Sequence, residues 1–222
     1  SSKLDDESLS VRAIFGRRLH YLWYLDHDFV LENLNTLFPR NQSTRDINRF
    51  SAAWDAYVSS NILHEDLFSR LRPCYFHAID LHTGDENTEI GNAQEGLAHH
   101  VLSAYLFDFE ELEGEDSLVT YLYDRDDPEL ARQMAWRLWR SGKDEEDIRQ
   151  KWVKVKTLWR VRLEQVDDVE AYSDEIQWFI EWLPMFEDQS ELAEAEPLLV
   201  DSLSFIAHTR RSWQTLETYL LD

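Results

Sequence analysis

The chain contains very little of the material that builds tight turns. Its 222 residues include only six glycines and five prolines. A sheet protein with many strands needs turn residues at regular short intervals, so this scarcity argues against such a fold. Helices joined by short polar loops need fewer of them. The hydrophobic share of 43% and the length suffice to bury a core without disulfides or metal ions.

Cysteine and long apolar runs are equally scarce. Cys74 is the single cysteine, so no internal disulfide can form, and we expect a reducing, cytoplasmic environment. No run approaches the roughly 18 apolar residues of a membrane-spanning helix, and the N-terminus has no apolar signal core. The chain lacks an initiator methionine and stops inside an apolar helical pattern. Both ends suggest a domain excised from a longer polypeptide, or a chain from which a tag was removed.

Positive charge is the third scarcity. Acidic residues number 44 against 22 basic ones, giving a net charge of -22, and the bases are 17 arginines and 5 lysines. This balance disfavours nucleic acid and anionic membranes as partners and leaves protein as the expected one. It fits a host with high internal salt, or equally an ordinary acidic protein from a GC-rich genome.

Helical periodicity, by contrast, runs through the whole chain. It predicts helices at 11–26, 28–38, 43–58, 65–81, 92–107, 127–140, 144–166, 170–186, 193–207 and 210–222. Pro73 is predicted to kink or divide one of them, and 118–123 allows either strand or helix. Helix pairs recur at roughly 35 to 45 residues without a repeated signature residue. We therefore predict an all-α protein, an irregular α-solenoid of about ten antiparallel helices.

A polar run at 83–89 is the clearest loop in this series of helices. It predicts a boundary between an N-terminal helical subdomain, 1–83, and a C-terminal subdomain rich in tryptophan, 92–222. One continuous solenoid is the alternative.

Tryptophans gather in the second of these parts. Six of the nine fall between 136 and 182, spaced so that pairs share one side of a helix: Trp136 with Trp139, Trp152 with Trp159, and Trp178 with Trp182. This spacing predicts packing between neighbouring helices.

One basic stripe interrupts the acidic background. Residues 148–163 hold six bases and no acid. With two tryptophans they form a candidate partner-binding stripe: Arg149, Lys151, Trp152, Lys154, Lys156, Trp159, Arg160 and Arg162. The alternative interpretation is that these bases pair with acids of adjacent helices, such as Glu145, Asp167, Asp174 and Glu175.

Catalytic motifs are absent from the sequence: it holds no phosphate-binding glycine loop, no dinucleotide fingerprint and no nucleophile elbow. The histidines offer the one enzymatic alternative, a helical metal-dependent phosphohydrolase of the His-Asp type. It would use His20, His27, Asp28, His99 or His100. Because these positions lack the spacing of established metal motifs, we predict no catalytic residue, no metal site and no cofactor.

Aromatic positions carry a resemblance to a known group. The pattern Leu37-Phe38-Pro39, Phe50-x-x-x-Trp54-x-x-Tyr57 and Leu67-Phe68 through Ile79 resembles the HEAT-like helical C-terminal regions of large multidomain prokaryotic proteins, as does Ala135-Trp136 through Pro184. In that group the helical region follows an ATPase, a Sir2-like or another effector domain, and several members act in antiviral defence. The resemblance implies a noncatalytic scaffold that contacts a protein partner or other domains of its parent chain.

Overall fold

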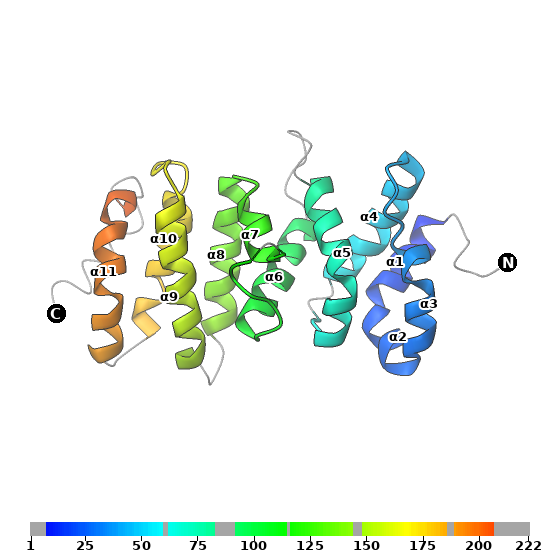
Figure 1. Cartoon of the computed structure of the whole chain (residues 1–222), viewed down its shortest axis with the longest axis horizontal. Coiled ribbons are helices and arrows are strands. Elements are labelled where there is room, and N and C mark those ends of the chain that lie inside the picture. The colour runs from blue at the N-terminus through cyan, green and yellow to red at the C-terminus, as the bar shows by residue number, and fades with distance from the viewer. Residues whose placement is uncertain are drawn as a thin grey trace. The chain divides into compact units, whose positions relative to one another are not determined.

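In a computed structural model, every described element of regular structure is helical (Figure 1). The structure describes residues 8–59, 62–82, 92–114, 116–143, 148–185 and 189–206. These ranges contain eleven α-helices, one short 3-10 helix and no strand, so the predicted all-α class is confirmed. The chain divides into two compact units, residues 1–125 and 126–222.

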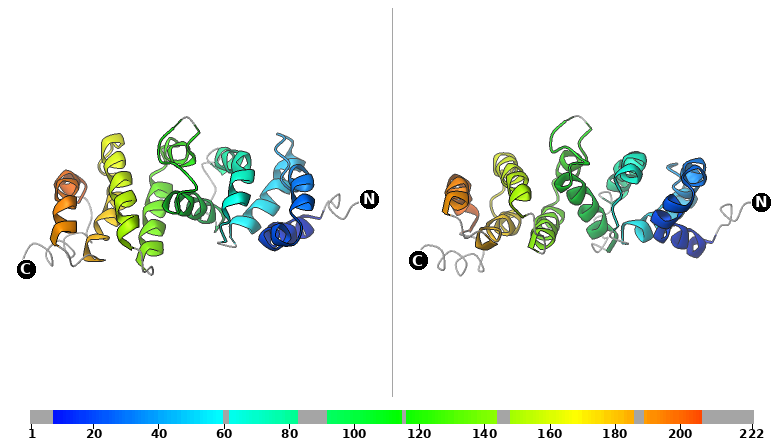
Figure 2. Two further views of the ribbon diagram at one scale, coloured as in Figure 1. Left: turned by 60° about the horizontal axis from the view of Figure 1, so that its bottom comes forward. Right: turned by 90° about the horizontal axis from the view of Figure 1, so that it is seen from below.

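Unit 1 is built around a central helix. Its helices are α1 (Leu9–Arg17), α2 (Leu19–Leu25), α3 (His27–Leu37), α4 (Thr44–Val58), α5 (Glu65–His82), α6 (Asn92–Leu106) and α7 (Leu118–Tyr123). Figure 2 shows them from two further sides, coloured from dark blue to green. Five side chains of α4 are completely buried: Phe50, Ala53, Trp54, Tyr57 and Val58. Two other helices, α1 and α6, pack against α4.

Two glycines allow these close helix contacts. A Cβ placed on Gly16 of α1 would lie 1.9 Å from the carbonyl oxygen of Ala53. A Cβ on Gly96 of α6 would lie 2.7 Å from the carbonyl oxygen of Val58. No side chain fits at such separations, so the absence of one lets the backbones of α1 and α6 approach α4.

Helix ends in unit 1 follow the capping signals of the sequence. Asp26 precedes α3 and accepts a hydrogen bond from the amide of Phe29 at 3.0 Å, and Ser43 likewise caps α4 through the amide of Asp46 at 3.2 Å. The other end of α3 is closed by Arg12, a buried side chain of α1 that donates to the carbonyl of Thr36 at 2.7 Å.

Three predictions for unit 1 need revision or resolution. The helix predicted at 11–26 is two helices, because the backbone leaves helical geometry at Arg18, where φ is -104°. Pro73 does not divide α5. Both it and Ser69, whose carbonyl a proline cannot bond, lie on the exposed side, where water can supply the missing donor. The ambiguous segment 118–123 is helix α7.

Unit 2 contains α8 (Pro128–Lys143), α9 (Ile148–Gln165), α10 (Ser173–Ile180), the 3-10 turn η2 (Leu183–Met185) and α11 (Gln189–Ile206). Asp127 starts α8 as predicted, because its Oδ1 accepts from the amides of Glu129 and Leu130, both at 3.0 Å. The helix predicted at 170–186 is shorter, because Trp182 turns back to the carbonyl of Phe179 and Pro184 follows. In contrast, α11 begins four residues before the predicted start at 193.

The division into units falls after Arg125, whereas the sequence placed a boundary at 83–91. That polar run lies outside the described residues, as do 144–147 and the helix predicted from 210. Of the two helices that follow the run, α6 packs against α4 and α5, and α7 packs against α5. They therefore belong to the same compact unit as the N-terminal helices.

Candidate interaction surface

The predicted basic stripe on α9 is not a continuous exposed face. Four of its members are buried: Lys151, Trp152, Trp159 and Arg162. Lys154 and Lys156 are partly exposed, Arg160 is exposed, and the side chain of Arg149 lies outside the described residues. The spacing along α9 was read correctly as helical, but the buried members face the interior of unit 2.

Two bases of α9, Arg162 and Lys156, pair with acids of neighbouring helices. Arg162 makes a two-pronged ion pair with Glu175 of α10, through Nε to Oε1 at 2.7 Å and Nη2 to Oε2 at 3.0 Å. Lys156 pairs with Glu194 of α11. The alternative interpretation, bases that bridge adjacent helices, thus holds for both, and Glu175 is one of the acids it named.

Burial makes the Arg162–Glu175 pair part of the core of unit 2. Arg162 and Glu175 expose 5% and 0% of their side chains. The Tyr172 ring lies 5.4 Å from the guanidinium carbon, and its hydroxyl donates to Asp126. Burial raises the pKa of Glu175, and the bonds to Arg162 act against that rise. This buried pair joins α9 to α10 and is not accessible to a binding partner.

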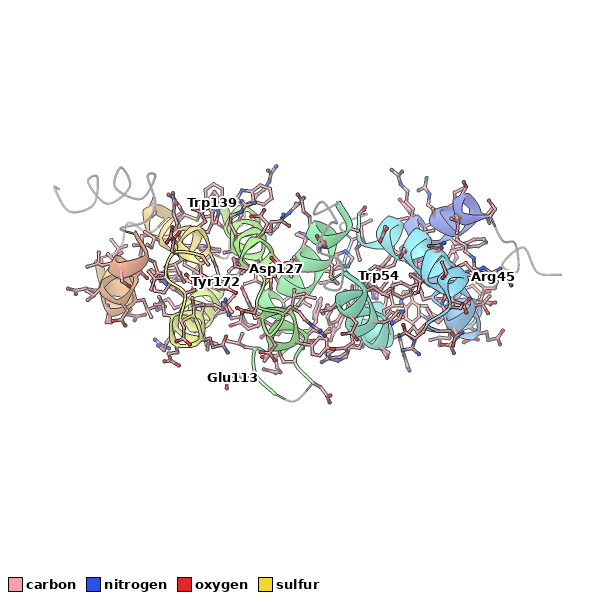
Figure 3. All side chains as sticks on the ribbon, turned by 90° about the horizontal axis from the view of Figure 1, so that it is seen from above. Arg45, Trp54, Glu113, Asp127, Trp139 and Tyr172 are labelled. Carbon is pink, nitrogen blue, oxygen red and sulfur yellow. The ribbon has the colours of Figure 1, made fainter. Side chains whose placement is uncertain are left out.

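Tryptophans in unit 2 link helices, as their spacing predicted. The Trp139 ring of α8 lies 5.1 Å from that of Trp178 on α10 (Trp139 is labelled in Figure 3). Trp152 of α9 stacks on Trp182 at 6.3 Å. Trp159 stacks on Phe179 at 6.1 Å and donates to Ser202 of α11 at 3.0 Å. These rings fill the spaces between helices.

The histidines of the enzymatic alternative lie in different surroundings. His27 and Asp28 are exposed at the start of α3, and the ring of His27 lies against Trp23. His20 is partly buried on α2, and His99 and His100 lie on α6. Among the described residues, no group of three or more histidine, cysteine, aspartate or glutamate side chains is placed to hold a metal ion.

His100 has a structural role inside unit 1. Its Nδ1 lies 2.7 Å from the hydroxyl of Tyr75, which in turn is 3.4 Å from the hydroxyl of Tyr57. All three side chains are buried. Burial, helped by neighbouring His99, lowers the pKa of His100 to about 3, so the imidazole is neutral where it is hydrogen-bonded to the Tyr75 hydroxyl. Cys74 beside Tyr75 is buried too, and burial raises the pKa of its thiol to about 11.

A second buried charge holds the loop after α6. Glu110, buried, accepts a hydrogen bond from the amide of Leu118 at 2.9 Å and thereby caps α7. Arg72 of α5 pairs with Glu110 and also donates to the carbonyl of Asp116. A hollow of about 350 Å³ lies beside this loop, and its charged lining residues Arg72 and Glu110 are already paired with each other.

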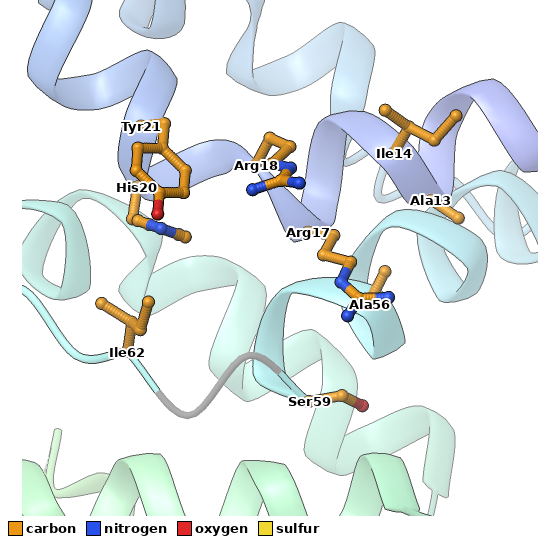
Figure 4. Close-up of a pocket in the computed structure, with 9 residues that line it drawn as sticks. All are labelled: Ala13, Ile14, Arg17, Arg18, His20, Tyr21, Ala56, Ser59 and Ile62. Carbon is orange, nitrogen blue, oxygen red and sulfur yellow. The ribbon is translucent and has the colours of Figure 1, made fainter.

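A hollow in unit 1 lies between the α1–α2 bend and the end of α4 (Figure 4). Its volume is about 560 Å³. Arg17, Arg18, His20 and Tyr21 reach it from the α1–α2 side. The rest of the lining is small or apolar: Ala13, Ile14, Ala56, Ser59 and Ile62. We call this set of nine residues the α1–α2 hollow.

Charge in the α1–α2 hollow is opposite to that of the chain as a whole. None of its nine lining residues is acidic. Arg17 and Arg18 are both exposed and have no ion pair in the described part of the chain. Burial, and then the charge of Arg18, lower the pKa of His20, so its ring is neutral at pH 7. Both ring nitrogens of His20 are buried, and neither has a hydrogen-bond partner among the described residues.

Exposed apolar side chains lie on the two helices that border the hollow, and two of them, Ile14 and Tyr21, line it. Tyr24 exposes 86% of its surface, Leu25 76%, Ile14 64% and Tyr21 52%. All four belong to α1 or α2. Isolated exposed apolar residues are ordinary on a protein surface, whereas a group on two successive helices beside unpaired arginines is typical of a binding surface.

The sequence contained an unused signal for this surface. Residues 19–25 read Leu-His-Tyr-Leu-Trp-Tyr-Leu, with apolar or aromatic side chains at six of seven positions. Such a run surrounds the whole helix, while one packed face can bury only part of it. Leu19 and Trp23 turn inward, so Tyr21, Tyr24 and Leu25 are left outside. The periodicity predicts one amphipathic helix at 11–26 and does not distinguish this excess from the buried face.

Comparison with protein-family models, curated proteins and solved structures found no match for this chain. In the described ranges, no helix has the length and apolar character needed to cross a membrane.

Proposed function

We propose that this chain is a noncatalytic helical interaction domain of a larger multidomain protein and that it works in the cytoplasm. Its helices would form a divergent HEAT-like α-solenoid, and its partner would be a protein or another domain of the parent chain. The resemblance of its aromatic positions to helical regions that follow effector domains supports this proposal, and so does its all-helical content. A role in antiviral defence is the biological setting that the resemblance suggests.

One observation carries the proposal. The exposed apolar side chains Ile14, Tyr21, Tyr24 and Leu25 gather on α1 and α2 beside two arginines that lack an acidic partner in the described residues. Tyrosine and arginine are enriched among the residues that dominate binding energy at protein interfaces. Exposing such side chains to water has a cost that burial against a partner removes.

Charge favours a protein over a nucleic acid as the partner. Binding a phosphate backbone draws on clustered bases, and this chain carries a net charge of -22. The same charge disfavours an anionic membrane surface. The basic residues of α9 do not supply a compensating patch, because half of the stripe is buried in unit 2.

The test compares two surface variants in partner capture from the host. Tyr24→Ser with Leu25→Ser removes the two most exposed large apolar residues in the described part of unit 1. Val153→Ser with Val200→Ser is the matched control, because these residues are exposed by 61% and 58% in unit 2. A protein captured by the unchanged chain would be purified and its affinity measured by calorimetry.

We expect the unit 1 variant to weaken that affinity by about 2 kcal/mol or more, roughly thirtyfold, and the control to leave it unchanged. Both variants should keep the circular dichroism spectrum of the unchanged chain, because the substituted side chains are exposed. Equal affinity for the unit 1 variant and the control would rule out this surface as the docking site.

A further inference from the structure

We infer that the α1–α2 hollow binds an acidic peptide segment of the partner, with an apolar side chain of that segment inserted between α2 and the end of α4. The inference rests on the proposed function, since it names the chemistry of the partner at that same surface. Three features of the hollow support it: its positive charge, its shape and apolar lining, and the buried ring nitrogens of His20.

Charge selects an acidic ligand. Arg17 and Arg18 are adjacent at the α1–α2 bend, and the partial negative charge of the last α1 carbonyls offsets only part of their two positive charges. Neither guanidinium is paired with a carboxylate in the described part of the chain, and the hollow itself has no acidic lining residue. The chain has twice as many acids as bases, yet these two adjacent arginines form no ion pair with a described residue. They offer planar donors that match carboxylates.

The shape and apolar lining of the hollow favour a ligand that carries an apolar side chain as well as negative charge. The hollow measures about 560 Å³, within the range of about 300–1,000 Å³ that is usual for ligand sites. Ile14 and Ile62 stand exposed on its rim, and Ala13 and Ala56 form part of its wall (Figure 4). An inorganic anion would leave this apolar surface in water. An aromatic or aliphatic side chain flanked by carboxylates would cover it and meet the arginines at once.

His20 supplies a polar group that a ligand can satisfy. Its two ring nitrogens are buried and have no hydrogen-bond partner in the described residues. A buried polar group in this state is costly, and a ligand that bonds to it recovers that cost. Because both nitrogens are buried, the ring must turn about its side-chain bonds to meet a ligand, and the neutral ring can then donate one hydrogen bond to a carboxylate oxygen or to a peptide carbonyl. The side chain lies beside Tyr21, 4.1 Å between ring centroids, at the edge of the same hollow.

The experiment selects peptides from a random-sequence display library against the immobilised full chain. Fluorescent copies of the enriched peptides are then titrated with the chain, and binding is followed by anisotropy. The test variant is Arg17→Glu with Arg18→Glu. The matched control is Arg40→Glu with Arg70→Glu, which makes the same charge change at two exposed arginines outside the hollow.

The expected result has three parts. Enriched peptides combine acidic residues with an apolar one, and replacing their acids by the corresponding amides weakens binding about tenfold or more. The Arg17 and Arg18 variant weakens binding by a similar factor. The Arg40 and Arg70 control stays within about twofold of the unchanged chain.

Four results would overturn the inference: no enrichment, enriched peptides without acids, binding that is indifferent to the Arg17 and Arg18 change, or displacement of the peptide by inorganic phosphate at similar concentration. The last would identify a simple anion site. These failures differ from failure of the proposed function. If the partner captured from the host is lost with the Tyr24 and Leu25 variant while acidic peptides fail, the docking surface stands and only the ligand chemistry is wrong.

Discussion

Breaking the Arg162–Glu175 pair tests whether α9 is an interior helix or a docking helix. The two side chains are joined by two hydrogen bonds, 2.7 and 3.0 Å long, and expose 5% and 0% of their surface. We consider three variants: Glu175→Leu, Arg162→Met, and both together. Each replacement keeps an extended apolar side chain of similar reach, so the cavity left behind is small.

The magnitudes follow from what each variant leaves buried. Glu175→Leu leaves the guanidinium without its counter-ion, and removing one partner of a buried pair costs about 3–5 kcal/mol. Gln165 still accepts a bond from Arg162 at 3.2 Å, which favours the lower part of this range. The double variant buries no charge, so we expect its free energy of unfolding to stay within about 1 kcal/mol of the unchanged chain. The coupling energy between the sites is then several kcal/mol.

Arg162→Met should make the stability of the folded protein depend on pH in a predictable direction. Burial already raises the pKa of Glu175 in the intact pair, and losing the guanidinium removes the interaction that opposes this rise. The folded variant therefore retains a proton that the unfolded chain releases near the ordinary glutamate pKa. Its stability should fall as pH rises above about 4.5, so the substitution costs more at pH 8 than at pH 5.

Hydrogen exchange is the appropriate assay because the chain has two compact units. Protection of the α9 and α10 amides reports unit 2 alone, while the α4 amides serve as the internal control. Glu175→Leu should reduce protection in α9 and α10 by a factor that corresponds to the predicted loss. A cost below about 1 kcal/mol, with unchanged protection, would mean that water already reaches the pair. The buried assignment of Arg162 would then be wrong, and the basic face of α9 would be available to a partner.

Two further predictions concern unit 1. Gly16→Ala places a Cβ 1.9 Å from the Ala53 carbonyl oxygen, so α1 must move away from α4. We expect a loss of about 1–3 kcal/mol in urea unfolding despite the better helix propensity of alanine. The exposed control Ser10→Ala on the same helix should change stability by no more than about 0.5 kcal/mol, and equal effects of the two would contradict the close contact. His100→Asn keeps an acceptor for Tyr75 but does not titrate. Because burial lowers the pKa of His100 to about 3, the unfolded chain binds a proton between pH 6.5 and 3 that the folded chain does not. The unchanged chain should therefore lose up to about 1.4 kcal/mol more stability per pH unit than the variant as pH falls through that window, and parallel pH profiles would show that His100 is not buried as a neutral ring.

Local signals in the sequence were reliable wherever a short stretch decides its own structure. Asp26, Ser43 and Asp127 each satisfy amides at a helix start, and these starts were predicted to within two residues. A capping side chain and the amide it serves lie within three residues of one another, so no distant contact is needed to place them. Two further predictions were confirmed. The scarcity of glycine and proline predicted helical structure, and the tryptophan spacing predicted packing between helices.

Signals that depend on which face of a helix turns inward were less reliable. The sequence left two interpretations of the stripe on α9 open, a partner-binding surface or bases that pair with acids of adjacent helices. Arg162 is buried, because Glu175 of α10 meets its guanidinium across the helix interface. The acids of the chain are too numerous for a sequence to show which of them reaches which base. The excess of apolar residues in α2 is a second case, because the periodicity predicted one amphipathic helix at 11–26 and did not show that Tyr24 and Leu25 would be strongly exposed.

The amino-acid sequence by itself determined that this protein is helical, where most of its helices begin and end, and that aromatic rings join them. These properties depend on residues a few positions apart, and hydrogen bonding and helix periodicity act over that range. The tertiary structure alone decided that α6 and α7 join unit 1, that Arg162 is an interior charge, and that Arg17, Arg18 and Ile62 border one hollow. Each of these depends on contacts between residues far apart in the chain, and the energy of such contacts comes from burial and pairing that no local pattern specifies.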